Sequence, residues 1–151
     1  MNAPGTRTLR MERVFAAPIT ATFDAWTTVE VLRRWWPAGV GWDTPVAELD
    51  VRVGGRLRLV MRDLNGAEFG GEGHYVVIER PHRLAFTWRW DSIALGTHDQ
   101  VVEVTFTDNG DGTTTVALTN SGLTDAEKPL HREGWDASFE NLDAVLEADQ
   151  L

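Results

Sequence analysis

Apolar and polar side chains alternate along most of residues 37–120, and this period-two pattern is the feature that most restricts the fold. It is clearest in residues 56–62, 84–90 and 102–107. Because successive side chains of a strand point to opposite faces of a sheet, the pattern is typical of antiparallel strands with one covered face and one wet face. Glycine-rich turns such as residues 108–112 separate the segments. The region is therefore predicted to be a meander of six strands.

Shorter elements are predicted before the meander. Residues 7–15 read as a first strand, and Pro18 opens a short helix. Thr27 and Glu30 have the spacing of a capping box and begin a second short helix, which ends at Pro37.

A long helix is predicted at the C-terminus. Thr124 and Glu127 have capping-box spacing, but Pro129 is expected to break an early turn, so the long helix is placed from about Pro129 onward. Acidic residues occupy its other sides, which predicts a helix laid against the sheet. Its apolar face is formed by His131, Trp135, Ser138, Phe139, Leu142, Val145 and Leu146.

The order strand, two short helices, six strands, long helix predicts one α+β domain over residues 7–150, after a loose leader at residues 1–6. A long antiparallel meander curls because sheets twist, and its concave face must be filled. The C-terminal helix is long enough to fill it. A gap is expected where helix and sheet diverge.

Charge and composition exclude several classes of protein. The formal net charge is −9, and residues 101–151 hold 11 acidic against 2 basic side chains, which disfavours nucleic-acid binding. The longest apolar runs are four residues, too short for a membrane span or a signal peptide, so a cytoplasmic location is expected. With no cysteine, disulfides and thiolate chemistry are excluded.

Tryptophan is unusually frequent, because it makes up seven of the 14 aromatic residues. Indole rings favour pockets and interfaces, and each N–H group needs a partner. Ordinary core filling explains any one of them equally well, but the set suggests an aromatic-lined pocket. The set is Trp36, Trp42, Trp88, Trp90 and Trp135.

Six motifs are spread over most of the chain: Arg13–Pro18, Phe23–Thr27, Trp35–Pro37, Asp50–Arg56, Gly73–Tyr75 and His131–Trp135. Together they resemble the family of the activator of the heat-shock-protein-90 ATPase, within the START-like (SRPBCC) superfamily. The resemblance covers residues 8–147. It implies a helix-grip fold, in which a seven-stranded curved antiparallel sheet surrounds the last helix and leaves a cavity.

The first functional hypothesis is a domain that binds a hydrophobic or aromatic small molecule in this cavity. His131 and Trp135 lie one helical turn apart, and Gly134 is expected to let the helix backbone approach the sheet. For His131, a purely structural hydrogen bond near the helix start is the stronger alternative. The predicted cavity residues are Trp36, Trp42, Leu59, Met61, Tyr75, Trp88, Trp90, Phe106, His131, Trp135, Phe139 and Leu142.

Other functions receive less support. No metal site is predicted, since the four histidines lack metal-ligand spacing. No cofactor and no catalytic residue are predicted either. Two alternatives follow from the resemblance: an interaction module for a heat-shock ATPase, and a cavity enzyme of the polyketide cyclase type. The protein is expected to be a monomer or homodimer. The arginines at 56, 58, 62 and 89 are predicted to pair with acidic neighbours on the wet sheet face.

Overall fold

The computed structural model describes residues 8–150, and the order of elements is the predicted one. The predicted leader lies outside the described residues. The strands are β1 (Leu9–Phe15), β2 (Asp43–Leu49), β3 (Arg56–Arg62), β4 (Glu68–Glu79), β5 (Arg83–Trp90), β6 (Gln100–Asp108) and β7 (Thr114–Ser121). The helices are α1 (Ile19–Asp24), α2 (Val29–Trp35) and α3 (Glu127–Asp149).

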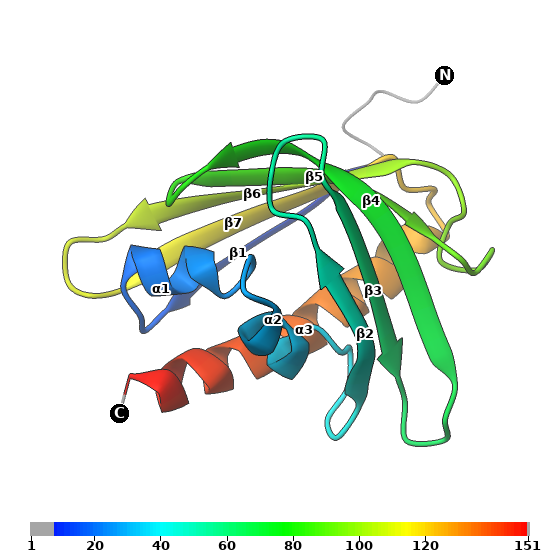
Figure 1. The fold of residues 1–151 in the computed structure, drawn as a ribbon, viewed down its shortest axis with the longest axis horizontal. Coiled ribbons are helices and arrows are strands. Elements are labelled where there is room, and N and C mark those ends of the chain that lie inside the picture. The colour runs from blue at the N-terminus through cyan, green and yellow to red at the C-terminus, as the bar shows by residue number, and fades with distance from the viewer. Residues whose placement is uncertain (1–7, 151) are drawn as a thin grey trace.

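The seven strands form one antiparallel sheet that curves around α3 (Figure 1). Its strand order is β1-β7-β6-β5-β4-β3-β2, so β1 and β2 occupy opposite edges. The chain crosses between these edges through α1 and α2, which cover part of the concave side (Figure 1). The predicted helix-grip architecture is confirmed.

The helix starts differ from their predictions in two places. α2 begins at Val29 with Thr28 as its N-cap and no side-chain cap bond, so the predicted Thr27 capping box is wrong. Before α3, Thr124 and Glu127 do form the reciprocal bonds of a capping box, at 3.0 and 3.2 Å. Pro129 does not delay α3, because it lies in the first turn, where a backbone N–H has no intrahelical acceptor.

The four arginines of the outer sheet face are paired, as predicted. Arg58 contacts Asp91 at 2.9 Å and Arg89 contacts Asp99 at 2.6 Å. Arg56 reaches Glu72, and Arg62 reaches Asp43. These exposed pairs contribute under about 1 kcal/mol each, and they leave this face electrically balanced.

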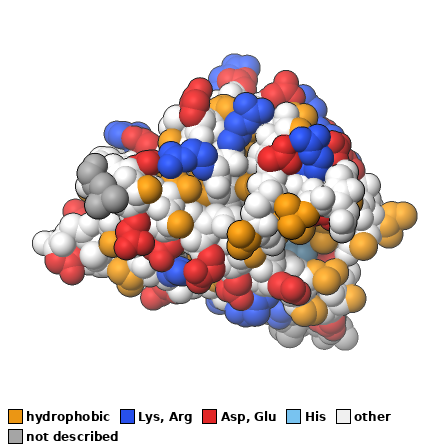
Figure 2. Space-filling model, turned by 90° about the horizontal axis from the view of Figure 1, so that it is seen from below, with side chains coloured by type: hydrophobic (Ala, Val, Ile, Leu, Met, Phe, Trp, Pro, Cys, Tyr) orange, Lys and Arg blue, Asp and Glu red, His pale blue; other side chains and the backbone are white. Residues whose placement is uncertain are grey.

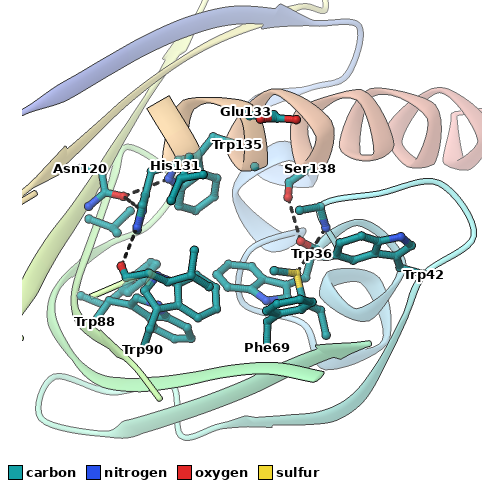
Figure 3. Close-up of a pocket in the computed structure, with 17 residues that line it drawn as sticks. Trp36, Trp42, Phe69, Trp88, Trp90, Asn120, His131, Glu133, Trp135 and Ser138 are labelled. Atoms are coloured by element: carbon teal, nitrogen blue, oxygen red, sulfur yellow. Dashed lines mark hydrogen bonds between the residues drawn. The ribbon is translucent and has the colours of Figure 1, made fainter. Parts of the chain in front are cut away.

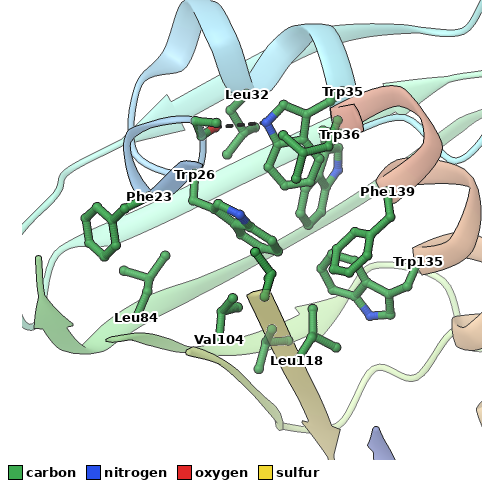
Figure 4. Packing of buried hydrophobic residues seen from close by; sticks show 14 of the residues in the cluster. Phe23, Trp26, Leu32, Trp35, Trp36, Leu84, Val104, Leu118, Trp135 and Phe139 are labelled. Carbon is green, nitrogen blue, oxygen red and sulfur yellow. Dashed lines mark hydrogen bonds between the residues drawn. The ribbon is translucent and has the colours of Figure 1, made fainter. Parts of the chain in front are cut away.

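A solid core fills the space between the sheet, the two short helices and the C-terminal half of α3 (Figure 4). Trp26 and Trp35 lie edge to face there, with ring centroids 4.6 Å apart, and Trp35 donates its indole N–H to Ala25 O at 2.9 Å. Phe139 of α3 packs against both Trp26 and Phe15. Aromatic side chains therefore fill the space beneath the C-terminal half of α3.

Candidate functional site

A cavity of about 290 Å³, hereafter the aromatic pocket, lies between the sheet and the N-terminal half of α3 (Figure 3). Its walls come from the end of α2 and the α2–β2 loop, from β3 to β7, from the β5–β6 loop and from one face of α3 between Leu130 and Ser138. Figure 2 shows a recess bordered by hydrophobic side chains, with histidine atoms visible inside it. The expected gap between helix and sheet is therefore present.

Five tryptophans border the aromatic pocket, and they are the five singled out in the sequence. Trp36 lies 5.4 Å from Trp88 and 5.7 Å from Trp135, measured between ring centroids. Trp88 and Trp90 meet at 5.3 Å with their planes 82° apart. Trp42 stacks on Phe69 at 5.9 Å. The planes of Trp42 and Phe69 are 15° apart, whereas the rings of the other pairs are steeply inclined, and both arrangements are favourable geometries for aromatic pairs.

Two glycines explain how indole rings lie against the backbone here. A Cβ atom on Gly71 of β4 would stand 2.4 Å from the Trp88 ring, and one on Gly39 would stand 2.5 Å from the Trp42 ring. Any larger residue would displace these rings. Gly71 and Gly39 are thus a sequence signal for the pocket wall that the alternation pattern alone does not reveal.

The structure divides the twelve predicted cavity residues into two groups. Seven of them border the aromatic pocket: Trp36, Trp42, Met61, Trp88, Trp90, His131 and Trp135. The other five are buried in the solid core instead, at 3% exposure or less: Leu59, Tyr75, Phe106, Phe139 and Leu142. Phe106 pairs with Phe23 of α1 at 5.2 Å, and Phe139 of α3 pairs with Phe15 of β1 at 5.6 Å.

The sequence reasoning missed several wall residues. Phe86 and Val102 continue the inward alternation of their strands and Ser138 belongs to the α3 stripe, so a signal existed for these three. Leu95 lies in the β5–β6 loop and Asn120 is an isolated polar residue of β7, and no pattern identified either one. The remaining missed wall residues are Ala38, Phe69, Leu130, Glu133 and Gly134.

The polar end of the aromatic pocket is built around Asn120. Its Oδ1 accepts a hydrogen bond from Trp135 Nε1 at 3.1 Å and lies 3.2 Å from His131 Nδ1. The second ring nitrogen of His131, Nε2, lies 2.9 Å from Leu95 O. His131 thus joins α3 to β7 and to the β5–β6 loop, which is the structural role that the sequence favoured.

Burial governs the protonation of His131. It is 6% exposed, and burial lowers the pKa of its imidazole below the usual 6.5, although the contact with Leu95 O and the charge of Glu127 act in the opposite direction. Burial alone would raise the pKa of Glu127. Hydrogen bonds from Thr124 N–H and His98 reverse this and hold it below its usual value.

Gly134 does not bring α3 closer to the sheet. A Cβ atom at this position would meet only Ala38 Cβ, at an ordinary 3.8 Å, so the predicted close approach is wrong. Both residues border the aromatic pocket, and the missing side chain widens it. Glu133, the one charged side chain in the pocket wall, is exposed and lies on the side of α3 away from the tryptophan rings (Figure 3).

Two further findings concern residues 8–150. None of their helices is both long and apolar enough to cross a membrane. In the same part of the chain, no three His, Asp or Glu side chains gather in a group that could hold a metal ion.

Comparison with known families identifies the chain. Residues 16–147 match the model of the family described as Activator of Hsp90 ATPase homolog 1-like protein. The chain belongs to this family. The predicted resemblance is confirmed, and the family's fold agrees with the helix-grip architecture.

Solved structures of similar proteins support this assignment. A protein from Chromobacterium violaceum is 27% identical with a TM-score of 0.84, covering 94% of this chain and 98% of its own. The AHSA1 protein from Silicibacter pomeroyi is 28% identical with a TM-score of 0.79, covering 94% and 99%. An AHSA1-like protein from Aeromonas hydrophila is 27% identical with a TM-score of 0.78, covering 95% and 94%. A comparison with curated proteins found no match.

Proposed function

We propose that this family member binds a neutral apolar or aromatic small molecule in the aromatic pocket. The observation that carries the proposal is an unfilled volume of about 290 Å³ bordered by five tryptophan rings. This volume lies just below the usual range of ligand sites in proteins, roughly 300–1,000 Å³, and suits a small occupant.

The pocket wall favours a neutral occupant. The indole N–H groups of Trp36, Trp88 and Trp90 are buried without a hydrogen-bond partner among the described residues, and none of these rings carries a charge. Ser138 Oγ already donates to Trp36 O at 2.8 Å. A charged ligand would lose its hydration without gaining a buried partner charge, which is strongly unfavourable.

Thermal unfolding in the presence of naphthalene tests the proposal. A ligand present at 100 times its Kd stabilises a protein by about 2.7 kcal/mol, which is a readily measured rise in Tm. The variant Gly134→Leu places a side chain in the pocket and should abolish the rise. Ala137→Leu, on the same helix but outside the pocket wall, is the matched control and should retain it.

Two outcomes would contradict the proposal. One is an unchanged Tm for naphthalene and for larger apolar probes. The other is an equal rise in Tm for the Gly134→Leu variant, which would place the binding elsewhere. We do not extend the proposal to a heat-shock ATPase partner or a cyclase-type reaction, since both rest on the resemblance alone.

A further inference from the structure

His131 faces a carbonyl oxygen with each of its two ring nitrogens. Nδ1 lies 3.2 Å from Asn120 Oδ1, and Nε2 lies 2.9 Å from Leu95 O. Both neighbours are hydrogen-bond acceptors, and neither can donate. His131 also borders the aromatic pocket.

Neighbouring bonds fix the orientation of Asn120. Trp135 Nε1 can only donate, so the amide atom that it contacts must be the oxygen. The amide nitrogen of Asn120 then points at Gln100 Oε1, at 3.4 Å. Flipping the amide would place two donors against each other at Trp135, so the side-chain oxygen of Asn120 stays directed at His131.

Both carbonyl oxygens have a donor other than His131. Asn120 Oδ1 receives the indole N–H of Trp135, and Leu95 O receives Gln100 Nε2 at 3.2 Å. Removing the imidazole nitrogens would therefore leave neither oxygen without a hydrogen bond. The unmet requirement belongs to His131 itself.

A neutral imidazole carries one N–H group and one lone pair. If Nε2 carries the hydrogen, the Nδ1 lone pair faces Asn120 Oδ1; if Nδ1 carries it, the Nε2 lone pair faces Leu95 O. In either tautomer, two acceptors lie about 3 Å apart with no hydrogen between them. An additional proton on the imidazole removes this repulsion, and so does an external donor that is shared between the lone pair and the oxygen it faces.

The groups around His131 disfavour the additional proton. Its side chain is 6% exposed, and burial opposes a positive charge. Glu127, on the same helix, favours protonation, whereas His98 from the β5–β6 loop opposes it. The remaining contacts, Asn120 of β7 and the Trp90 ring of β5 at 6.2 Å, are uncharged.

We propose that His131, with the carbonyl oxygen that its lone pair faces, accepts a hydrogen bond from an O–H or N–H group of the ligand. The inference rests on the proposed function and makes it more specific. The ligand is a neutral aromatic compound that carries a hydroxyl group or a ring N–H at one end. Its ring lies among the tryptophans, and its donor points to the end of the pocket that β7 and the β5–β6 loop form.

A comparison of 2-naphthol with 2-methylnaphthalene tests this inference. The two compounds have nearly the same shape, but only the first can donate. Their dissociation constants are measured by equilibrium dialysis for the unaltered protein and for His131→Phe, which retains an aromatic ring and removes both nitrogens. The ratio of the two dissociation constants is then compared between the two proteins. Because the same two ligands enter both ratios, their different solubilities in water cancel in this comparison.

The preference for 2-naphthol should fall about threefold to tenfold in His131→Phe, as expected for one hydrogen bond. The affinity for 2-methylnaphthalene should change little, because the carbonyl oxygens keep their other donors. A ratio equal to that of the unaltered protein would overturn the inference while leaving the proposed function intact. If neither compound binds even the unaltered protein, both the inference and the proposed function fail.

A pH titration of the unaltered protein provides a second measurement that needs no substitution at His131. Lowering the pH favours protonation of His131, whose pKa burial holds below 6.5, and protonated His131 has no lone pair to offer. The preference for 2-naphthol should decline as nitrogen chemical shifts show His131 becoming protonated, and it should decline equally in His74→Gln, which removes an exposed histidine. A preference that stays constant while His131 becomes protonated would refute the inference. So would nitrogen chemical shifts showing both ring nitrogens of His131 protonated at neutral pH.

Discussion

Replacing Gly134 by alanine should stabilise the protein. Gly134 lies in the interior of α3, where glycine is about 0.8–1.0 kcal/mol less favourable than alanine. The new methyl group would meet only Ala38 Cβ at 3.8 Å, an ordinary van der Waals contact, so no steric penalty offsets the gain. The free energy of unfolding should rise by about 1 kcal/mol, which corresponds to a Tm increase of roughly 2–4 °C for a chain of this size.

Urea denaturation followed by circular dichroism measures this change, with Ala137→Gly on the same helix as the reverse control. That variant should lose about 1 kcal/mol for the same conformational reason. A lower free energy of unfolding for Gly134→Ala would refute the reasoning. It would mean that α3 approaches its neighbours more closely at this point than the 3.8 Å contact indicates.

Three further predictions concern other parts of the molecule. The buried Tyr75 hydroxyl has no hydrogen-bond partner among the described residues, so Tyr75→Phe should leave the free energy of unfolding unchanged or raise it by up to about 1 kcal/mol in thermal unfolding. A clear loss of stability would contradict this and reveal a partner for the hydroxyl. Leu142 is fully buried, so Leu142→Ala should lower the free energy of unfolding, measured in urea, by about 2.7–5 kcal/mol. Leu130 is 46% exposed at the pocket, and Leu130→Ala should lower it much less. Equal losses would contradict the division between core and pocket. Burial lowers the pKa of His131 in the folded state, so the unfolded chain takes up this proton at a higher pH than the folded protein. The free energy of unfolding should therefore fall as the pH drops below about 6.5, by at most about 1.4 kcal/mol per pH unit. His131→Phe should lose this part of the pH dependence, and identical stability profiles for the two proteins would contradict its assignment to His131.

The architecture could be predicted because the strands are amphipathic. Alternation placed Leu84, Phe86 and Trp88 on the covered face, and all three are buried. Tyr75, predicted as a cavity residue, is buried on β4, and its neighbour His74 is exposed, because successive side chains of a strand point to opposite faces. Residues of this kind are governed by a local period, so one sequence is sufficient to orient them.

The wall of the aromatic pocket was harder to predict, because a side chain on the inward face can meet either a cavity or another side chain. Phe106 and Trp88 are both inward, yet Phe106 packs against Phe23 of α1 while Trp88 borders the pocket. The difference depends on where α1 and α3 lie over the sheet, which is tertiary information. Asn120 shows the same limit, since its role depends on Trp135 and His131 on another element.

The two halves of α3 impose different requirements on the residues that they carry. Leu142 and Leu146 pack in the solid core, so changes in volume there are felt throughout the domain. Leu130, Gly134 and Ser138 border an unfilled volume, where a change of shape meets empty space before it meets a neighbour. Pocket-wall positions can therefore be redesigned for new ligands on an unchanged scaffold, which makes this end of the helix the natural starting point for an engineered small-molecule sensor.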